Sequence, residues 1–226
     1  MKASVIKEIL AYKGVEYLYH VNTVVTSLTY INNGGLLSRG SVEDAGLLQT
    51  PQESDYLDRE FDVFYDIFFD SVDIHERAKQ TNHYGVIAFE FSIDVLDELD
   101  DCDILITKDN PIRWKSAEDY ENNYFTNERD LYDYFFKGNF AQHITIRKPY
   151  RPIRFDYLKN IIIETPYEME NKTFNVALES IENALMNNGY NPDLLVFRKC
   201  SSDCRCKAEY KNNHPGFTYY RFTTKL

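Results

Sequence analysis

The apolar run at residues 85–91 is the sequence feature that most constrains the fold. Glycine opens the run, and valine, isoleucine, alanine and phenylalanine fill all but one of the other positions. This length, with β-branched and aromatic residues, is typical of a strand that is buried on both faces. We therefore predict that residues 85–91 form a central strand of a sheet.

Other segments carry strand or helix patterns in no regular order. Strands are predicted at residues 16–21, 104–107, 140–147, 158–164, 194–197 and 217–223. Helices are predicted at residues 4–12, 23–33, 128–136 and 175–186. Because the two kinds of element do not alternate, we expect an α+β fold rather than a doubly wound sheet. No repeat or Pro/Gly-rich linker divides the sequence, so residues 1–226 are predicted to form a single domain.

The charge of the chain is unevenly distributed. The formal net charge is −11, and an acidic protein repels phosphate backbones on average. Residues 41–103 hold 18 acidic and three basic side chains, and such a surface suits a basic protein partner or an antitoxin. Residues 137–159 are instead basic and rich in aromatic rings, as in a nucleic-acid or dinucleotide contact. The alternative for this stretch is a strand face that is merely basic.

Three of the four cysteines lie close together near the C-terminus. Cys200, Cys204 and Cys206 are followed by His214, and three thiolates with one imidazole can fill a tetrahedral zinc site. The C-x3-C-x-C spacing matches none of the common zinc signatures, so we assign no metal site and expect free thiols in a polar loop. The first eight residues carry charges where a signal peptide needs apolar residues, and no apolar run is long enough to span a membrane. We therefore expect a cytoplasmic protein.

A histidine, a glycine-terminated helix and an arginine follow one another early in the chain. His20 and Asn22 lie at the end of a predicted strand, and Arg39 comes shortly after the Asn-Asn-Gly-Gly stop of the next helix. A histidine can donate a hydrogen bond to a ribose hydroxyl, glycines let a ligand approach the backbone, and an arginine can clamp a pyrophosphate. No Walker loop, dinucleotide fingerprint, nucleophile elbow or zinc-protease helix is present.

This segment resembles the NAD-binding segment of DarT-type ADP-ribosyltransferases. The resemblance covers roughly the first 90 residues. The matching residues are His20, Gly35, Leu36, Leu37, Ser38 and Arg39, and Asn22 is added to the residues expected to bind NAD. It implies an ADP-ribosyltransferase-like fold with split β-sheets and flanking helices, and NAD bound as a substrate between the sheets. It also implies a nucleic acid base as the acceptor, DNA rather than RNA, and a role as a toxin or phage-defence effector.

The resemblance also implies positions for catalytic residues. Arg77 occupies the place of an arginine that reaches the active site in the family. The family's catalytic glutamate lies on a late strand and favours the developing positive charge. Residues 140–147 take that place by order, and they present Gln142, which hydrogen-bonds but carries no charge. The alternatives are that Glu164 is the carboxylate, that the chain binds a nucleotide without turning it over, or that the resemblance is accidental.

A second hypothesis belongs to a different class of protein. The chain would be a non-catalytic, acidic interaction protein of phage or mobile-element origin, and its acidic segment would bind a basic partner. A third hypothesis is a metal-dependent nuclease that uses the carboxylates of residues 55–73. These carboxylates lack the fixed spacing of a calcium loop, so a solvated or partner-facing acidic edge is the preferred interpretation.

Overall fold

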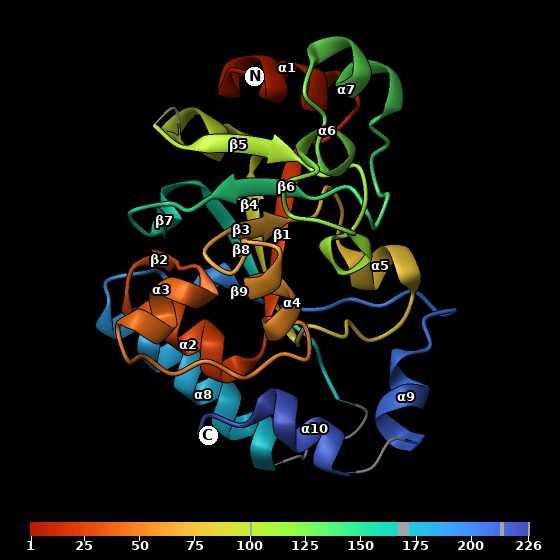
Figure 1. The fold of residues 1–226 in the computed structure, drawn as a ribbon. Helices are drawn as coiled ribbons and strands as arrows, with labels where there is room; N and C mark the ends of the chain where they lie inside the picture. Colours follow the sequence, from red (N-terminus) through yellow and green to blue (C-terminus); the bar gives the residue numbers. More distant parts are fainter. Residues whose placement is uncertain (100, 167–171, 213–214, 226) are drawn as a thin grey trace.

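The computed structural model of the chain describes residues 1–99, 101–166, 172–212 and 215–225, and it shows an α+β protein (Figure 1). The strands of the described ranges are β1 (Tyr17–Asn22), β2 (Gly35–Leu36), β3 (Ile67–Phe69), β4 (Ile87–Ser92), β5 (Asp103–Ile106), β6 (Ile144–Arg147), β7 (Ile153–Arg154), β8 (Leu158–Ile163) and β9 (Leu195–Phe197). The α-helices are α1 (Ala3–Tyr12), α2 (Val24–Asn32), α3 (Arg39–Asp44), α4 (Asp55–Glu60), α5 (Ile74–Ala78), α6 (Tyr120–Asn123), α7 (Glu128–Tyr134), α8 (Lys172–Asn187), α9 (Cys206–Asn212) and α10 (Pro215–Phe222).

The predicted central strand is confirmed as β4. It lies between β1 and β8 in a sheet of order β1-β4-β8-β9, antiparallel to both neighbours, and β9 adds a parallel edge. Ile87, Phe89 and Phe91 on one face of this strand are fully buried, and Ala88 and Ser92 on the other face are 2% and 8% exposed. Phe89 stacks on Phe155 with ring centroids 5.6 Å apart. Burial on both faces explains why the sequence of β4 is almost continuously apolar.

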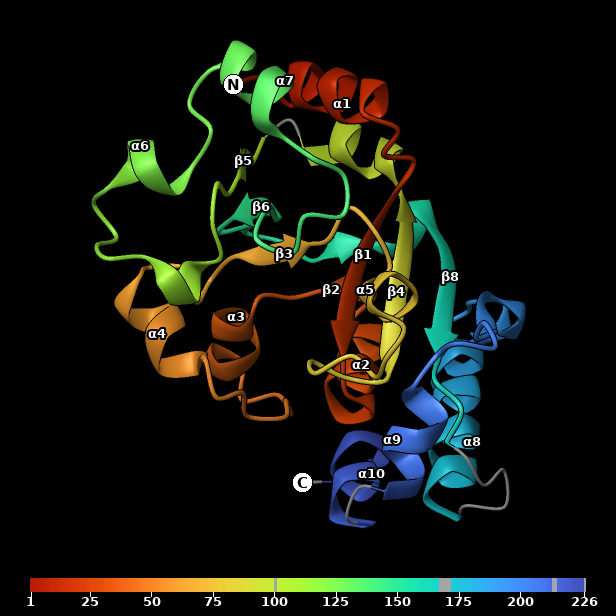
Figure 2. The same ribbon diagram turned by 90° about the vertical axis from the view of Figure 1, so that its right-hand side faces the viewer.

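A second sheet of order β3-β6-β5 lies beside the edge of the first sheet (Figure 2). A bridge between Tyr19 of β1 and Asp70, directly after β3, connects the two sheets. The short strands β2 and β7 pair separately. The sheets are therefore split along one side, and this arrangement leaves space for a cavity between β1 and β3.

Helices cover the sheets on several sides. Helix α1 packs on α7 and on a 3-10 helix at Ile93–Leu99, whereas α2 packs on α8 (Figure 1). The main core is continuous under both sheets. A smaller cluster under α4 contains Phe61, Val63, Leu105, Trp114 and Tyr124.

One predicted strand is wrong. Residues 217–223 are rich in β-forming residues, but this segment belongs to helix α10 (Pro215–Phe222). Proline at the first position of a helix has the required φ and lacks only an N–H that would be unbonded there. Phe222 is fully buried and contacts Phe174 of α8, with ring centroids 5.6 Å apart. Packing of this aromatic face against α8 therefore overrides the local β propensity.

Candidate functional site

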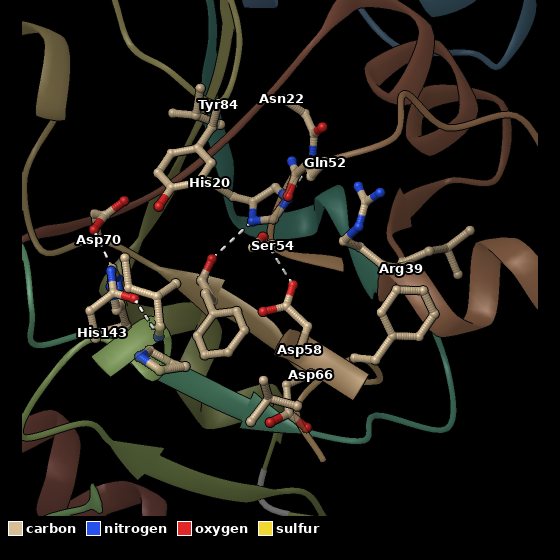
Figure 3. A pocket seen from close by; sticks show the side chains of 18 of the residues that line it. His20, Asn22, Arg39, Gln52, Ser54, Asp58, Asp66, Asp70, Tyr84 and His143 are labelled. Atoms are coloured by element: carbon tan, nitrogen blue, oxygen red, sulfur yellow. Dashed lines mark hydrogen bonds and ion pairs between the residues drawn. The ribbon is translucent and has the colours of Figure 1, made fainter. Parts of the chain in front are cut away.

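A cavity lies between the two sheets, where β1 diverges from β3 (Figure 3). Its empty volume is about 850 Å³ with the open mouth included. Its apolar wall includes Tyr30, Val63, Phe64 and Phe68. The polar residues that line it are His20, Asn22, Arg39, Gln52, Ser54, Asp58, Asp66, Asp70, Tyr84, Asn110 and His143.

His20 is held in one orientation by the backbone of β3. Its Nδ1 lies 2.9 Å from the carbonyl oxygen of Phe68, so this nitrogen carries the proton and donates. Burial lowers the pKa of His20 below its usual value, so the ring is neutral. Its Nε2 then accepts from Asn22 Nδ2 at 3.3 Å. The single acceptor lone pair of Nε2 is therefore taken by the Asn22 amide, so the ring positions Asn22 beside the cavity, whereas the sequence suggested that it donates to a ligand.

Arg39 is fixed as the first residue of α3. The Ser38 hydroxyl caps this helix by accepting from Ser41 N at 3.1 Å. The guanidinium pairs with both oxygens of Asp55, and Nη2 also donates to the Thr50 carbonyl at 3.1 Å. These contacts orient the side chain, which is 12% exposed, beside the cavity.

Two buried polar atoms beside the cavity have no hydrogen-bond partner in the described part of the chain. They are Arg39 Nη1, a donor, and Asn22 Oδ1, an acceptor. Six other buried side-chain atoms of the described residues are also unpaired, but only these two belong to side chains that line the cavity, which makes them candidate contacts for a polar ligand. The site combines a cation, an amide and the neutral ring of His20.

Three carboxylates also line the cavity. Burial raises the pKa of Asp58 to about 6 and that of Asp66 to about 7, although Arg147 opposes the second shift from 2.7 Å. Asp70 accepts a hydrogen bond from His143 Nδ1 at 3.1 Å (Figure 3). The cavity is therefore less negative near neutral pH than its three carboxyl groups suggest, and the Asp70–His143 pair lies at one end of it.

The raised pKa of Asp58 predicts a pH-dependent stability. Burial raises the pKa of Asp58 from 3.8 to about 6, so the protonated carboxyl is the form that the folded state favours. Its contribution to the free energy of unfolding is complete below about pH 4 and is lost as the pH rises through 6. We expect Asp58→Asn to raise the free energy of unfolding by about 1–2 kcal/mol near pH 7.5 and to change it little near pH 4. Urea denaturation at the two pH values measures this, and an equal difference at both would contradict it.

The structure brings together some of the residues singled out in the sequence. His20, Asn22 and Arg39 line one cavity. Gly35 and Leu36 form β2, paired with β7, and Ser38 caps α3. These three residues therefore position Arg39 and do not line the cavity.

Three residues expected to be catalytic, Arg77, Gln142 and Glu164, do not line this cavity. Arg77 lines a separate depression beside Tyr17 and Lys137. Gln142 accepts from the backbone N–H of residue 136 at 2.8 Å and donates to the carbonyl of residue 134 at 3.0 Å, which fixes the turn before β6. Glu164 follows the end of β8, and its carboxylate bonds His75 instead.

His143, next to Gln142, is the residue that reaches the cavity. Adjacent side chains in extended backbone point to opposite sides, so an error of one residue exchanges the two faces. Sequence reasoning also missed Asp70 and Tyr84. Their only signal is that each lies in a loop at the end of a strand, where functional side chains are common.

The acidic and basic segments of the chain partly neutralise each other. Arg147 and Lys148 of the basic stretch both pair with Asp62 of the acidic one, at 3.3 and 2.7 Å. Arg151 pairs with Asp101 at 3.3 Å. Charges that were expected to face separate partners therefore bond across the small sheet and at its edge.

Fold and cavity together define an α+β protein with a cavity lined by polar side chains between two split sheets. No protein-family model matches the chain, and no curated protein matches its sequence. Among solved structures, the chain is similar to DarT from Thermus sp. 2.9 in complex with ADP-ribosylated ssDNA. The alignment covers 81% of this chain and 97% of that chain, with 8% identity and a TM-score of 0.48. None of the described helices is long and apolar enough to cross a membrane.

Proposed function

We propose that the chain is a NAD-dependent ADP-ribosyltransferase that binds the dinucleotide through His20, Asn22 and Arg39. The observation that carries this proposal is the pair of unpartnered atoms, Arg39 Nη1 and Asn22 Oδ1, beside one cavity between split sheets. A guanidinium N–H suits a phosphate oxygen, and an amide oxygen suits a ribose hydroxyl or a carboxamide N–H. The order of His20 and Arg39 in the sequence, which resembles the DarT family, supports the same assignment.

We assign to Asp70 the negative charge that stabilises the positive ribose during transfer of ADP-ribose. NAD supplies a glycosidic bond whose cleavage releases nicotinamide and leaves positive charge on the ribose. A carboxylate fixed near that charge stabilises it electrostatically without itself moving. Asp70 is 16% exposed, lies in the cavity and is oriented by His143, so it takes the role that the sequence suggested for Gln142 or Glu164.

The proposed acceptor is a base of single-stranded nucleic acid, with DNA preferred. Tyr84 and Ile112 line the cavity and are 43% and 51% exposed, so each has a surface available to an incoming base. Stacking of a base on a tyrosine ring is tolerant of sequence and contributes about 1–3 kcal/mol. The basic stretch at residues 137–159 is a weaker candidate for this contact, because its Arg147, Lys148 and Arg151 are paired with carboxylates.

Arg39→Gln is expected to lower NAD affinity about tenfold to a hundredfold, because it removes a charge-assisted hydrogen bond to a phosphate. Isothermal titration with NAD measures the affinity, and labelled NAD with single-stranded DNA or RNA measures transfer. The matched control is Arg129→Gln, which removes an arginine that is 90% exposed, pairs with Asp133 and lies outside the cavity. If the wild-type chain neither binds NAD nor transfers its label, the proposed function is wrong.

The acidic interaction protein remains the alternative function. The internal pairing of Asp62, Asp66 and Asp101 with basic residues weakens it, since these carboxylates are not free to face a partner. Binding of NAD without transfer to any acceptor would instead favour a nucleotide-binding protein without turnover.

A further inference from the structure

Four potential metal ligands converge outside the lining of the cavity. His75 of α5 lies beside Cys200 and Cys204, from the segment between β9 and α9, and Cys206, the first residue of α9, and their ligand atoms all lie within 4.8 Å of one another. His75 and Cys206 are each 2% exposed, and Cys200 and Cys204 are half-buried. The cysteines therefore do not lie in a polar loop as the sequence suggested. His214, the fourth ligand considered in the sequence, lies outside the described residues.

Three of the six distances among these atoms are close to the edges of a tetrahedral zinc site. With Zn–S bonds of about 2.3 Å and a Zn–N bond of about 2.0 Å, tetrahedral angles give S···S and S···N edges of about 3.8 and 3.5 Å. Cys200 Sγ lies 3.5 Å from Cys206 Sγ, and His75 Nε2 lies 3.4 Å from the sulfurs of both Cys200 and Cys204. A disulfide would need two sulfurs at about 2.05 Å, and these cysteines are free.

The environment of His75 holds its Nε2 toward the sulfurs. Its Nδ1 lies 2.5 Å from Glu164 Oε1, and the Glu164 carboxylate also accepts from the Tyr210 hydroxyl and from the Asn82 N–H. A histidine that ligates zinc typically donates its other ring N–H to a carboxylate, which fixes the ring orientation and the tautomer. Glu164 therefore orients the ring of His75 so that Nε2 faces the cysteine sulfurs.

The chain around the cluster is cross-linked by buried polar contacts. Asp73 caps α5 by accepting from the His75 N–H at 3.0 Å and pairs with Arg198 at 2.5 Å. The N–H of Arg205 donates to the Lys79 carbonyl at 2.8 Å. These contacts join the loop after α5 to the C-terminal segment. Among the described residues, no strand after β9 connects this segment to the sheets. A metal ion at this junction would fix α9 against the body of the protein.

We propose that His75, Cys200, Cys204 and Cys206 bind one structural Zn²⁺ ion. Binding replaces the protons of three thiols, which are released to solvent, while the imidazole binds as a neutral ligand through Nε2. The ion and three thiolates leave a net charge of −1, and no change of oxidation state is involved. Four protein ligands complete the tetrahedron, so this is a closed structural site rather than a catalytic one with an open position.

The metal content of the purified chain tests this proposal. Protein prepared without chelators is expected to contain about one zinc per chain by mass spectrometry of the metals. Cys204→Ser is expected to lose the zinc and to lower the Tm by about 10 °C. The matched control is Cys102→Ser, since Cys102 lies outside the cluster and its loss should leave the zinc in place.

Cobalt substitution keeps the test decisive if Cys204→Ser does not fold. Wild-type protein reloaded with Co²⁺ is expected to show the intense visible absorption of a tetrahedral site and thiolate-to-cobalt bands in the near ultraviolet. His75→Asn should weaken the visible bands while keeping the thiolate bands. The proposal is overturned by iron in place of zinc, by a disulfide between Cys200 and Cys206, or by wild-type protein that holds no zinc and gives no cobalt spectrum.

Discussion

Gly85→Ala is expected to destabilise the chain by about 3 kcal/mol or more and to abolish ligand binding in the cavity. A Cβ atom at Gly85 would lie 2.0 Å from the carbonyl carbon and oxygen of Asn22, and 2.5 Å from the nitrogen of Thr23. Both neighbours are backbone at the end of β1, where Val86 N donates to Asn22 O at 3.1 Å. The backbone must therefore move apart, and Asn22 with its unpaired Oδ1 moves with it.

The comparison variant for this test is Gly40→Ala. A Cβ atom there would meet the Tyr65 ring at 2.5 Å, but Tyr65 is 39% exposed and can rotate toward solvent. We expect Gly40→Ala to cost about 1–2 kcal/mol, because the whole Tyr65 ring has to move and loses its hydrogen bond to Asp44, but no backbone has to separate. Urea denaturation of both variants gives the comparison. Equal, small losses of stability would show that β1 and β4 can separate without cost.

The elements that could be predicted from the sequence are those whose own pattern determines them. Strand β4 is apolar at nearly every position because both faces are covered, and Gly189 with φ of +77° closes α8 as the Asn-Asn-Gly stop predicts. The last helix could not be predicted, since burial of Phe222 against Phe174 depends on chain segments far apart in the sequence. Local propensity carries no information about such a contact.

The residues around the cavity also fall into two groups, those indicated by a local sequence pattern and those that depend on contacts between distant segments. His20 and Arg39 could be found because each lies beside a strand end or a helix start with a recognisable pattern. The choice of His143 over Gln142 depends on which side of the chain faces the cavity, and this is set only by the pairing of β6 with β3 and β5. Likewise, His75 is 125 residues from Cys200, so no spacing rule could have linked the two.

Asp70→Asn is expected to lower the rate of transfer from NAD about a hundredfold to a thousandfold, while NAD affinity changes less than about threefold. Removing one preorganised electrostatic group from an active site typically has an effect of this size on kcat. Affinity is kept because Arg39 and Asn22 provide the proposed contacts to the ground state, so the loss falls on the transition state. Single-turnover assays with labelled NAD measure the rate, and titration with NAD measures the affinity.

The Asp70→Asn substitution is expected to change the charge at this position without disturbing the fold. Its backbone N–H and carbonyl both bond Tyr19 at 2.9 Å, and these contacts join the two sheets whichever side chain is present. Asparagine keeps the shape and an acceptor for His143 but removes the negative charge. The matched control is Asp62→Asn, which removes a carboxylate that is 61% exposed and lies outside the cavity. If both variants retain the wild-type rate, the charge of Asp70 does not act on the reaction and the catalytic group lies elsewhere in the cavity.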